Sequence, residues 1–243
     1  MPLNLTKFYS INFSLPKRAK NSIKFIIIHY TGMKKESKAI RRLCDSKAKV
    51  SSHYFIKNSG DILSLVPELY EAWHAGKSNW KNFDSLNKNS IGIEISNPGH
   101  DHGYKKFSLN QISSLIELLK YLVKKYKIKR QDILGHSDIA PNRKKDPGEK
   151  FPWNQLAKKN LCKWHNLNEN YIKKYRGLKP NAYEEKIFLD NLYKIGYSGI
   201  NKIKSKKEKV AFIKTFQRKF RQKLISGIID KECLLISKNL IKS

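Results

Sequence analysis

Short apolar runs alternate with amphipathic stretches along the first two thirds of the chain. KFIIIHYT (24–31) and IGIEISN (91–97) are continuous apolar runs, typical of strands that are buried on both faces. SSHYFIKNSGDILSLV (51–66) predicts a β-hairpin, because two β-rich runs flank a polar turn with glycine. Helical spacing predicts helices over ESKAIRRLCDS (36–46) and SLNQISSLIELLKYLVKKYKI (108–128). The pattern therefore predicts strands interleaved with helices.

The pattern changes in the last third of the chain. Residues 163–180 are polar and basic and contain Gly177 and Pro180, which predicts a linker. Residues 181–243 carry only helical periodicity and predict three short helices. We therefore expect two domains, a larger one over 1–175 and a small helical one over 181–243.

Composition narrows the class of protein. With 243 residues and 40% hydrophobic content, the chain can bury one sizeable core. No apolar run is long enough to cross a bilayer, so we expect no membrane partner. The N-terminus lacks the basic start and apolar stretch of a signal peptide, which favours a cytoplasmic location, or a periplasmic one if a signal has been removed. Three scattered cysteines, without a CxxC pair, favour ordinary thiols over a disulfide framework or a cysteine zinc site.

The formal net charge of +30 raises the possibility of a nucleic-acid partner. However, only eight of the 50 basic residues are arginine, the residue that reads bases bidentately. Lysine, asparagine and isoleucine are all abundant, and all three have A/T-rich codons. We therefore interpret the charge first as a compositional bias and second as a preference for anionic partners, and we expect no nucleic-acid partner.

One acidic residue interrupts a predicted buried strand. In IGIEISN the isoleucines 91, 93 and 95 face one side, and Glu94 faces the other. An unpaired carboxylate in a buried strand costs on the order of several kcal/mol, so Glu94 must face a cleft, a partner or a metal. An ion pair with a lysine is the alternative.

A second polar cluster lies in ILGHSDIAPNRKKDPG (133–148). Lys144 and Asp146 are two positions apart in a segment where Pro141 and Pro147 argue against a regular helix, and extended chain would point both side chains the same way. Two histidines and one carboxylate from separate segments are typical of a catalytic zinc site, although any single histidine is more often a core or surface residue. His29, His136 and Asp146 fit the ligands, Glu94 a general base and Lys144 an oxyanion stabiliser.

Five blocks carry a family resemblance: IIIHYTG, VSSHYFIKNSGDI, AWHAGKSNW, NSIGIEISNPG and GHSDIAPNRKKDPGEKFPW. Over roughly residues 22–160 the chain resembles the zinc-dependent N-acetylmuramoyl-L-alanine amidases of the anhydro-muropeptide recycling type, whose fold is shared with peptidoglycan-recognition proteins and phage amidases. The resemblance implies an α/β fold in which a central mixed β-sheet is flanked by helices, with a zinc cleft on one face.

The resemblance also implies roles for single residues. It makes His29, His136 and Asp146 the zinc ligands, Glu94 the catalytic glutamate and Lys144 the catalytic lysine. For His53, Trp73 and His74 it suggests substrate-binding or cleft-lining roles. A hydrogen-bonded structural role is an equal alternative for each of the two histidines, and loop packing is the alternative for Trp73. Peptidoglycan fragments or wall polymer would be the substrate, and no obligatory protein partner is implied.

The C-terminal segment carries a weaker resemblance. KIGY, AFIKTFQRKFR and GIIDKECLLISKNL are similar to the small three-helix peptidoglycan-binding domain found in many wall amidases. A generic helical cap is the alternative, because the phenylalanines and isoleucine of the second block have core spacing. For the whole chain, the alternative to an amidase is a module that binds muropeptides without cutting them. The presence of all three metal ligands with Glu94 and Lys144 argues against that alternative.

Overall fold

The computed structural model describes residues 5–242. Its α-helices are α1 (Glu36–Cys44), α2 (Leu109–Tyr126), α3 (His136–Ile139), α4 (Trp153–Lys158), α5 (Glu169–Lys173), α6 (Ala182–Ile195), α7 (Lys206–Phe220) and α8 (Lys231–Lys242). Its strands are β1 (Leu5–Lys7), β2 (Phe13–Ser14), β3 (Phe25–Tyr30), β4 (Tyr54–Ile56), β5 (Ile62–Ser64), β6 (Glu71–Ala72), β7 (Asn79–Trp80), β8 (Phe83–Asp84), β9 (Ser90–Ile95) and β10 (Ile133–Gly135). None of the helices in residues 5–242 has the length and apolar character needed to cross a bilayer.

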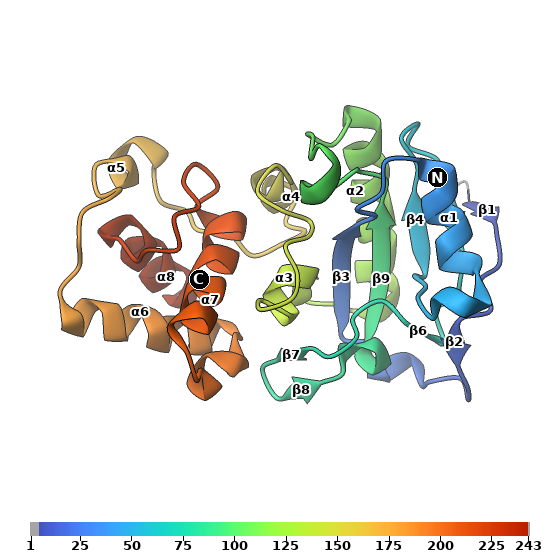
Figure 1. Ribbon diagram of the computed structural model, residues 1–243, viewed down its shortest axis with the longest axis horizontal. Helices are drawn as coiled ribbons and strands as arrows, with labels where there is room; N and C mark the ends of the chain where they lie inside the picture. The colour runs from blue at the N-terminus through green and yellow to red at the C-terminus, as the bar shows by residue number, and fades with distance from the viewer. Residues whose placement is uncertain (1–4, 243) are drawn as a thin grey trace.

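A mixed six-stranded sheet forms the centre of the larger part, in the order β1-β5-β4-β9-β3-β10. β3 pairs in parallel with both β9 and β10, and within this six-stranded sheet of the described residues only the β4–β5 hairpin is antiparallel. The predicted hairpin and the predicted buried strands are thereby confirmed, as is the central mixed sheet flanked by helices (Figure 1). Apart from His29, Ser90 and Glu94, the central strands β3 and β9 are apolar, as expected for strands that helices and loops cover on both faces.

One face of the sheet is sealed by α2. Ile26, Ile28 and the three isoleucines of β9 pack against the apolar stripe of this helix. The helix begins as predicted, because Ser108 and Gln111 form a capping box. This face is a closed apolar core and leaves no room for a polar site.

The opposite face is covered in two separate places. Near β4 and β5, α1 contributes Ala39 and Leu43 to an apolar cluster with Phe55. Near β3 and β10, Phe25 and Ile27 join a second cluster that includes residues of α6, α7 and α8. Because the two clusters do not meet, a cleft of about 490 Å³ lies between them over the middle of the sheet.

The three predicted C-terminal helices are confirmed as α6, α7 and α8. They lie beside the β10 edge of the sheet, with α3 between them and β3 (Figure 1). Trp80 packs edge-on against Tyr197, with ring centroids 4.8 Å apart, so the two parts share one apolar cluster. The boundary near residue 180 stays a prediction, and the predicted linker contains the short helix α5.

Candidate metal centre

β3 and β9 bring the first two site residues together, since each residue lies one position before the end of its strand. His29 is the register partner of Glu94 across the parallel pair, so both side chains rise from the same face of the sheet. That face is the one with the cleft, and both residues line it. The strand alternation that singled out Glu94 therefore pointed to the correct face.

The segment after β10 supplies the other two ligand candidates. It differs locally from the expectation of an irregular, extended chain, because residues 136–139 form the one-turn helix α3. A proline cannot donate a backbone hydrogen bond within a helix, but Pro141 lies beyond the end of this turn and does not prevent it. A backbone hydrogen bond then brings Asp146 back beside α3, since the Ser137 N–H donates to the Asp146 carbonyl at 2.9 Å.

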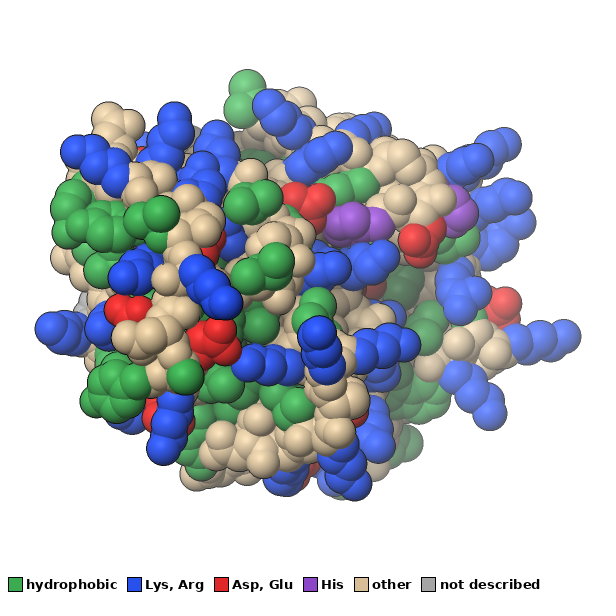
Figure 2. Space-filling model, turned by 60° about the vertical axis from the view of Figure 1, so that its left-hand side comes forward, with side chains coloured by type: hydrophobic (Ala, Val, Ile, Leu, Met, Phe, Trp, Pro, Cys, Tyr) green, Lys and Arg blue, Asp and Glu red, His purple; other side chains and the backbone are tan. Residues whose placement is uncertain are grey.

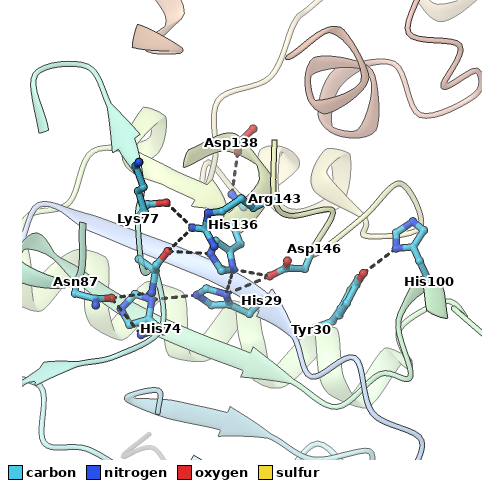
Figure 3. A network of polar contacts seen from close by, with 12 residues as sticks. His29, Tyr30, His74, Lys77, Asn87, His100, His136, Asp138, Arg143 and Asp146 are labelled. Atoms are coloured by element: carbon cyan, nitrogen blue, oxygen red, sulfur yellow. Dashed lines mark hydrogen bonds and ion pairs between the residues drawn. The ribbon is translucent and has the colours of Figure 1, made fainter. Parts of the chain in front are cut away.

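Three buried ligand atoms converge in this cleft (Figure 3). His29 Nδ1 lies 2.9 Å from His136 Nδ1 and 3.2 Å from Asp146 Oδ2, and His136 Nδ1 lies 3.1 Å from the same oxygen. Metal–ligand bonds of about 2.0–2.2 Å in tetrahedral zinc sites place neighbouring ligand atoms roughly 3.3–3.6 Å apart. The triangle is only slightly tighter than that, so one small ion fits against all three atoms.

The remaining nitrogens of the two histidines are held by hydrogen bonds that define the tautomers. His136 Nε2–H donates to the Ala75 carbonyl at 3.1 Å, which leaves His136 Nδ1 without a proton in the neutral ring. His29 Nε2 lies 3.1 Å from His74 Nδ1. The direction of this second hydrogen bond depends on the partners of His74.

Ser90 settles the direction. Its hydroxyl donates to the Leu86 carbonyl at 2.6 Å, so Ser90 Oγ can only accept from His74 Nε2–H, which lies 3.3 Å away. His74 Nδ1 therefore accepts from His29 Nε2–H, and His29 Nδ1 carries a lone pair toward the cleft. Two imidazole lone pairs and a carboxylate that face one another repel unless a cation lies between them. The donor set therefore fits a metal ion.

Burial supports neutral imidazoles in this cluster. Desolvation, and then the neighbouring His136, lower the pKa of His29 to about 4. Desolvation also lowers the pKa of His74 well below its ordinary value. For Asp146, burial raises the pKa, but the proximity of His136 and His29 lowers the pKa overall. The carboxylate is therefore the natural anionic member of the donor set.

Glu94 differs from the three ligand candidates. Its Oε2 is buried and has no hydrogen-bond partner among residues 5–242. Desolvation and then the charge of Asp146 raise its pKa to about 8, while Lys144 opposes the shift. A carboxyl group with an unpartnered oxygen and a raised pKa, beside a metal-binding cluster, has the properties of a general base or acid. Lys144 is half-buried and lines the same cleft.

The three residues predicted to bind substrate lie in different places. Trp73 lines the cleft, and its indole N–H donates to Ser14 Oγ at 2.8 Å. His74 also lines the cleft and contacts His29, and its ring fits there because residue 92 is glycine: a Cβ at Gly92 would lie 2.4 Å from the ring. His53 is fully buried and is not among the lining residues. Its Nδ1 accepts from the Gly92 N–H at 2.9 Å, a structural contact.

Two supporting residues escaped the sequence interpretation. Ser90 shares the strand alternation of Glu94, so that pattern could have found it. Asn87 accepts from the backbone N–H groups of His74 and Ala75, at 3.1 and 2.7 Å, and so holds the turn that contacts both histidine ligand candidates (Figure 3). A lone asparagine in a loop gives no such signal.

These features define a class of protein: an α/β protein with a metal-compatible His-His-Asp cluster in a cleft on one face of a mixed sheet. Comparison with known proteins agrees. The family described as N-acetylmuramoyl-L-alanine amidase matches residues 19–149. The chain is 35% identical over 234 residues to the N-acetylmuramoyl-L-alanine amidase AmiD of Escherichia coli, covering 90% of this chain and 83% of that protein.

Further relatives and solved structures extend the agreement. The 1,6-anhydro-N-acetylmuramyl-L-alanine amidase AmpD of Haemophilus influenzae is 40% identical over 43% of this chain and 55% of its own length. The structure of E. coli AmiD with the substrate anhydro-N-acetylmuramic acid-L-Ala-D-gamma-Glu-L-Lys has a TM-score of 0.81 at 33% identity, covering 94% of this chain and 92% of that one. AMPDH3 of Pseudomonas aeruginosa gives 0.79 at 29% identity, covering 94% of each chain.

The chain belongs to the N-acetylmuramoyl-L-alanine amidase family. The family resemblance carried by the five sequence blocks is thereby confirmed. The prediction of a hydrolase that acts on the muramoyl–L-alanine amide bond is confirmed as well. The basic surface is consistent with this result, since Lys and Arg side chains are spread over the face shown in Figure 2 rather than gathered in one groove.

Proposed function

We propose that the protein is a zinc-dependent amidase that cleaves the amide between the lactyl group of N-acetylmuramic acid, including its 1,6-anhydro form, and L-alanine of the stem peptide. The observation that carries the proposal is the convergence of His29 Nδ1, His136 Nδ1 and Asp146 Oδ2, with hydrogen bonds that leave both nitrogens free of protons. Two histidines and one carboxylate are a ligand set of catalytic zinc sites.

The zinc ion, when bound, would polarise the scissile carbonyl and lower the pKa of water. The chain itself supplies the proton transfers. Glu94 would take the proton of the attacking water and then return it to the leaving amine of L-alanine, a role that suits a buried carboxylate lining the same cleft. The Lys144 ammonium, on the same cleft wall as Asp146, would stabilise the negative charge that develops on the carbonyl oxygen.

The cleft also suggests how substrate is held. Arg42, Arg143 and Lys145 line it together with Lys144, which favours an anionic substrate such as a peptide stem with free carboxylates. Trp73 offers an aromatic surface for a sugar ring. For the anhydro form, support comes from the related AmiD and AMPDH3 structures, whose complexes hold an anhydro-N-acetylmuramic acid peptide and an anhydromuramic pentapeptide.

A digest tests the proposal. Purified protein is incubated with an anhydro-muramyl tripeptide and with intact sacculi, with and without a chelator, and products are identified by mass spectrometry. We expect free peptide beginning with L-alanine, lost with the chelator and restored by zinc. No cleavage of either substrate would favour a muropeptide-binding module, and cleavage that resists the chelator would contradict the zinc requirement. In the same digest, a preference for the soluble fragment would favour a role in recycling over turnover of intact wall.

A further inference from the structure

A second buried polar cluster lies on the same short helix as His136. α3 has four residues, too few to be stable alone, so its position depends on contacts with other elements. His136 and Asp138 are two positions apart on this turn and project from it to different surroundings (Figure 3). His136 lies in the metal cluster, whereas Asp138 lies against the C-terminal helices.

Two side chains from the C-terminal helical region bind the Asp138 carboxylate. Lys219 of α7 donates from Nζ to Asp138 Oδ2 at 2.7 Å, and the Tyr197 hydroxyl donates to Oδ1 at 2.7 Å. The Gly135 backbone N–H completes the set, at 2.8 Å from Oδ2. The three side chains are 2%, 4% and 1% exposed for Asp138, Lys219 and Tyr197, so the carboxylate and ammonium depend on each other for compensation.

Lys219 also contacts the strand that leads into α3. Its Nζ lies 3.4 Å from the Ile133 carbonyl at the start of β10 and 4.4 Å from the centroid of the Trp153 ring. The ammonium therefore sits at the junction of β10 and α3. In Figure 1, α3 lies between β3 and the C-terminal helices, which is where this contact forms.

Two members of the metal cluster, His136 and Asp146, are coupled to the position of α3. His136 directly follows Gly135, where a Cβ would come within 2.6 Å of Pro147, so the backbone before His136 packs tightly on the residue after Asp146. The Ser137 N–H also donates to the Asp146 carbonyl. A shift of Asp138 therefore displaces His136 and Asp146 relative to His29, which is anchored in the sheet.

We propose that Lys219 and Tyr197 are positioning residues for the metal ligand His136, so that the C-terminal helical region is a structural part of the metal centre and not only an appended module. This inference rests on the proposed metal site. It is independent of whether these helices bind wall polymer.

The test uses the full chain with four substitutions: Lys219→Met, Lys219→Arg, Tyr197→Phe and, as a matched control, Arg221→Met. Arg221 is also a buried cation of this region, but its charge partners are Asp230, 3.0 Å away, and Glu232, 3.8 Å away, and neither belongs to α3. The readouts are the zinc dissociation constant by chelator competition and the visible absorption spectrum of the cobalt(II)-substituted protein, which reports coordination geometry.

We expect Lys219→Met to raise the zinc dissociation constant about 10- to 100-fold and to change the cobalt spectrum, with partial recovery in Lys219→Arg. Arg221→Met should lower stability but keep the dissociation constant within about twofold. Tyr197→Phe, which removes one hydroxyl, should give a smaller increase of the same sign and carries the test if Lys219→Met does not fold.

Three results would overturn the inference. One is unchanged zinc affinity and cobalt spectrum in Tyr197→Phe and in any folded Lys219→Met protein. Another is equal weakening in Arg221→Met, which would indicate a general loss of stability. The third is failure of the unsubstituted protein to bind zinc, which alone would also overturn the proposed function, so the two failures are distinguishable.

Discussion

Two buried charged clusters share the short helix α3, and they are completed in opposite ways. Around Asp138 every partner is present: Lys219 supplies a positive charge, and Tyr197 and Gly135 supply further donors. Around Asp146 the two nearest groups are imidazole nitrogens that hydrogen bonds on the far sides of the rings leave without protons. The first cluster is closed by the chain itself, and the second needs a cation from outside.

The difference distinguishes buried charged groups that stabilise the fold from buried charged groups that bind a ligand. A closed ion pair holds elements together, and its charges are compensated once the chain has folded. An incomplete donor set in a cleft keeps an unfavourable arrangement that a bound ion relieves, and Glu94, with its unpartnered oxygen, adds to that arrangement. Burial and ionisable chemistry alone would not have distinguished the two clusters; the completeness of their hydrogen bonding does.

The largest expected loss of activity comes from disrupting the cluster of His29, His136 and Asp146, called here the open cluster. His136→Ala should remove one ligand and with it both zinc binding and amidase activity, with activity falling by several orders of magnitude. Metal content by elemental analysis and the muropeptide digest measure the two losses. His102→Ala is the matched control, because His102 is exposed and lies outside the cleft lining, and it should leave both unchanged. Stoichiometric zinc in His136→Ala would contradict the ligand assignment.

The next effect separates the base from the ligands. Glu94→Gln keeps the size of the side chain but cannot accept a proton, so zinc should stay bound while the rate falls about 10²- to 10⁴-fold. Steady-state cleavage of the anhydro-muramyl tripeptide, with zinc content measured on the same sample, gives both values. Full activity in this variant would exclude Glu94 as the base.

The sequence predicts the open cluster but not the closed cluster around Asp138 and Lys219. Glu94 and its partners were predictable because strand alternation and local motifs put unusual residues at fixed positions: an acid within isoleucines, and a histidine at the end of a buried strand. The closed cluster was not, because Asp138 and Lys219 are far apart in sequence and Lys219 is one lysine among many in a basic chain. Its significance depends on burial and packing between elements, which local pattern does not encode.

The fold shows the same limit. The hairpin, the buried strands and the long capped helix were predicted because each follows from local spacing and turn residues. The one-turn helix α3 was missed, since nearby prolines argued against helix and four residues give no periodicity. The order of strands, which brings His29 beside Glu94, was not predicted, because the family resemblance implied a mixed sheet without a strand order and local pattern does not encode pairing between distant strands.

A double-mutant cycle should show that the closed cluster acts as a pair. Lys219→Met alone leaves the Asp138 carboxylate buried without its cation and should lower the free energy of unfolding by about 3–5 kcal/mol. Adding Asp138→Asn to that variant should cost much less than Asp138→Asn does alone, giving a coupling free energy of about 2 kcal/mol or more. Denaturant unfolding of the four metal-free proteins provides the values, and additive effects would show that the pair is not coupled.

The smallest expected effect on zinc affinity comes from Ser90, which fixes the tautomer of His74. Ser90→Ala removes the acceptor of His74 Nε2–H, so His74 loses the contact that makes it accept from His29. The zinc dissociation constant should rise about tenfold, while the fold and the Glu94 side chain stay in place. Ser96→Ala, another buried serine of the same segment, has no contact with the histidines among the described hydrogen bonds and is the control. Equal zinc affinity in Ser90→Ala and the unsubstituted protein would show that Ser90 does not orient the His74–His29 hydrogen bond.

The central claim, that the open cluster is a zinc site formed through two Nδ1 atoms and one carboxylate oxygen, is tested most directly by anomalous diffraction at the zinc absorption edge from crystals of the full chain. We predict one anomalous peak at about 2.0–2.2 Å from His29 Nδ1, His136 Nδ1 and an Asp146 carboxylate oxygen. A crystal grown with zinc that shows no peak in this cleft, or a peak bound through other atoms, would contradict the claim.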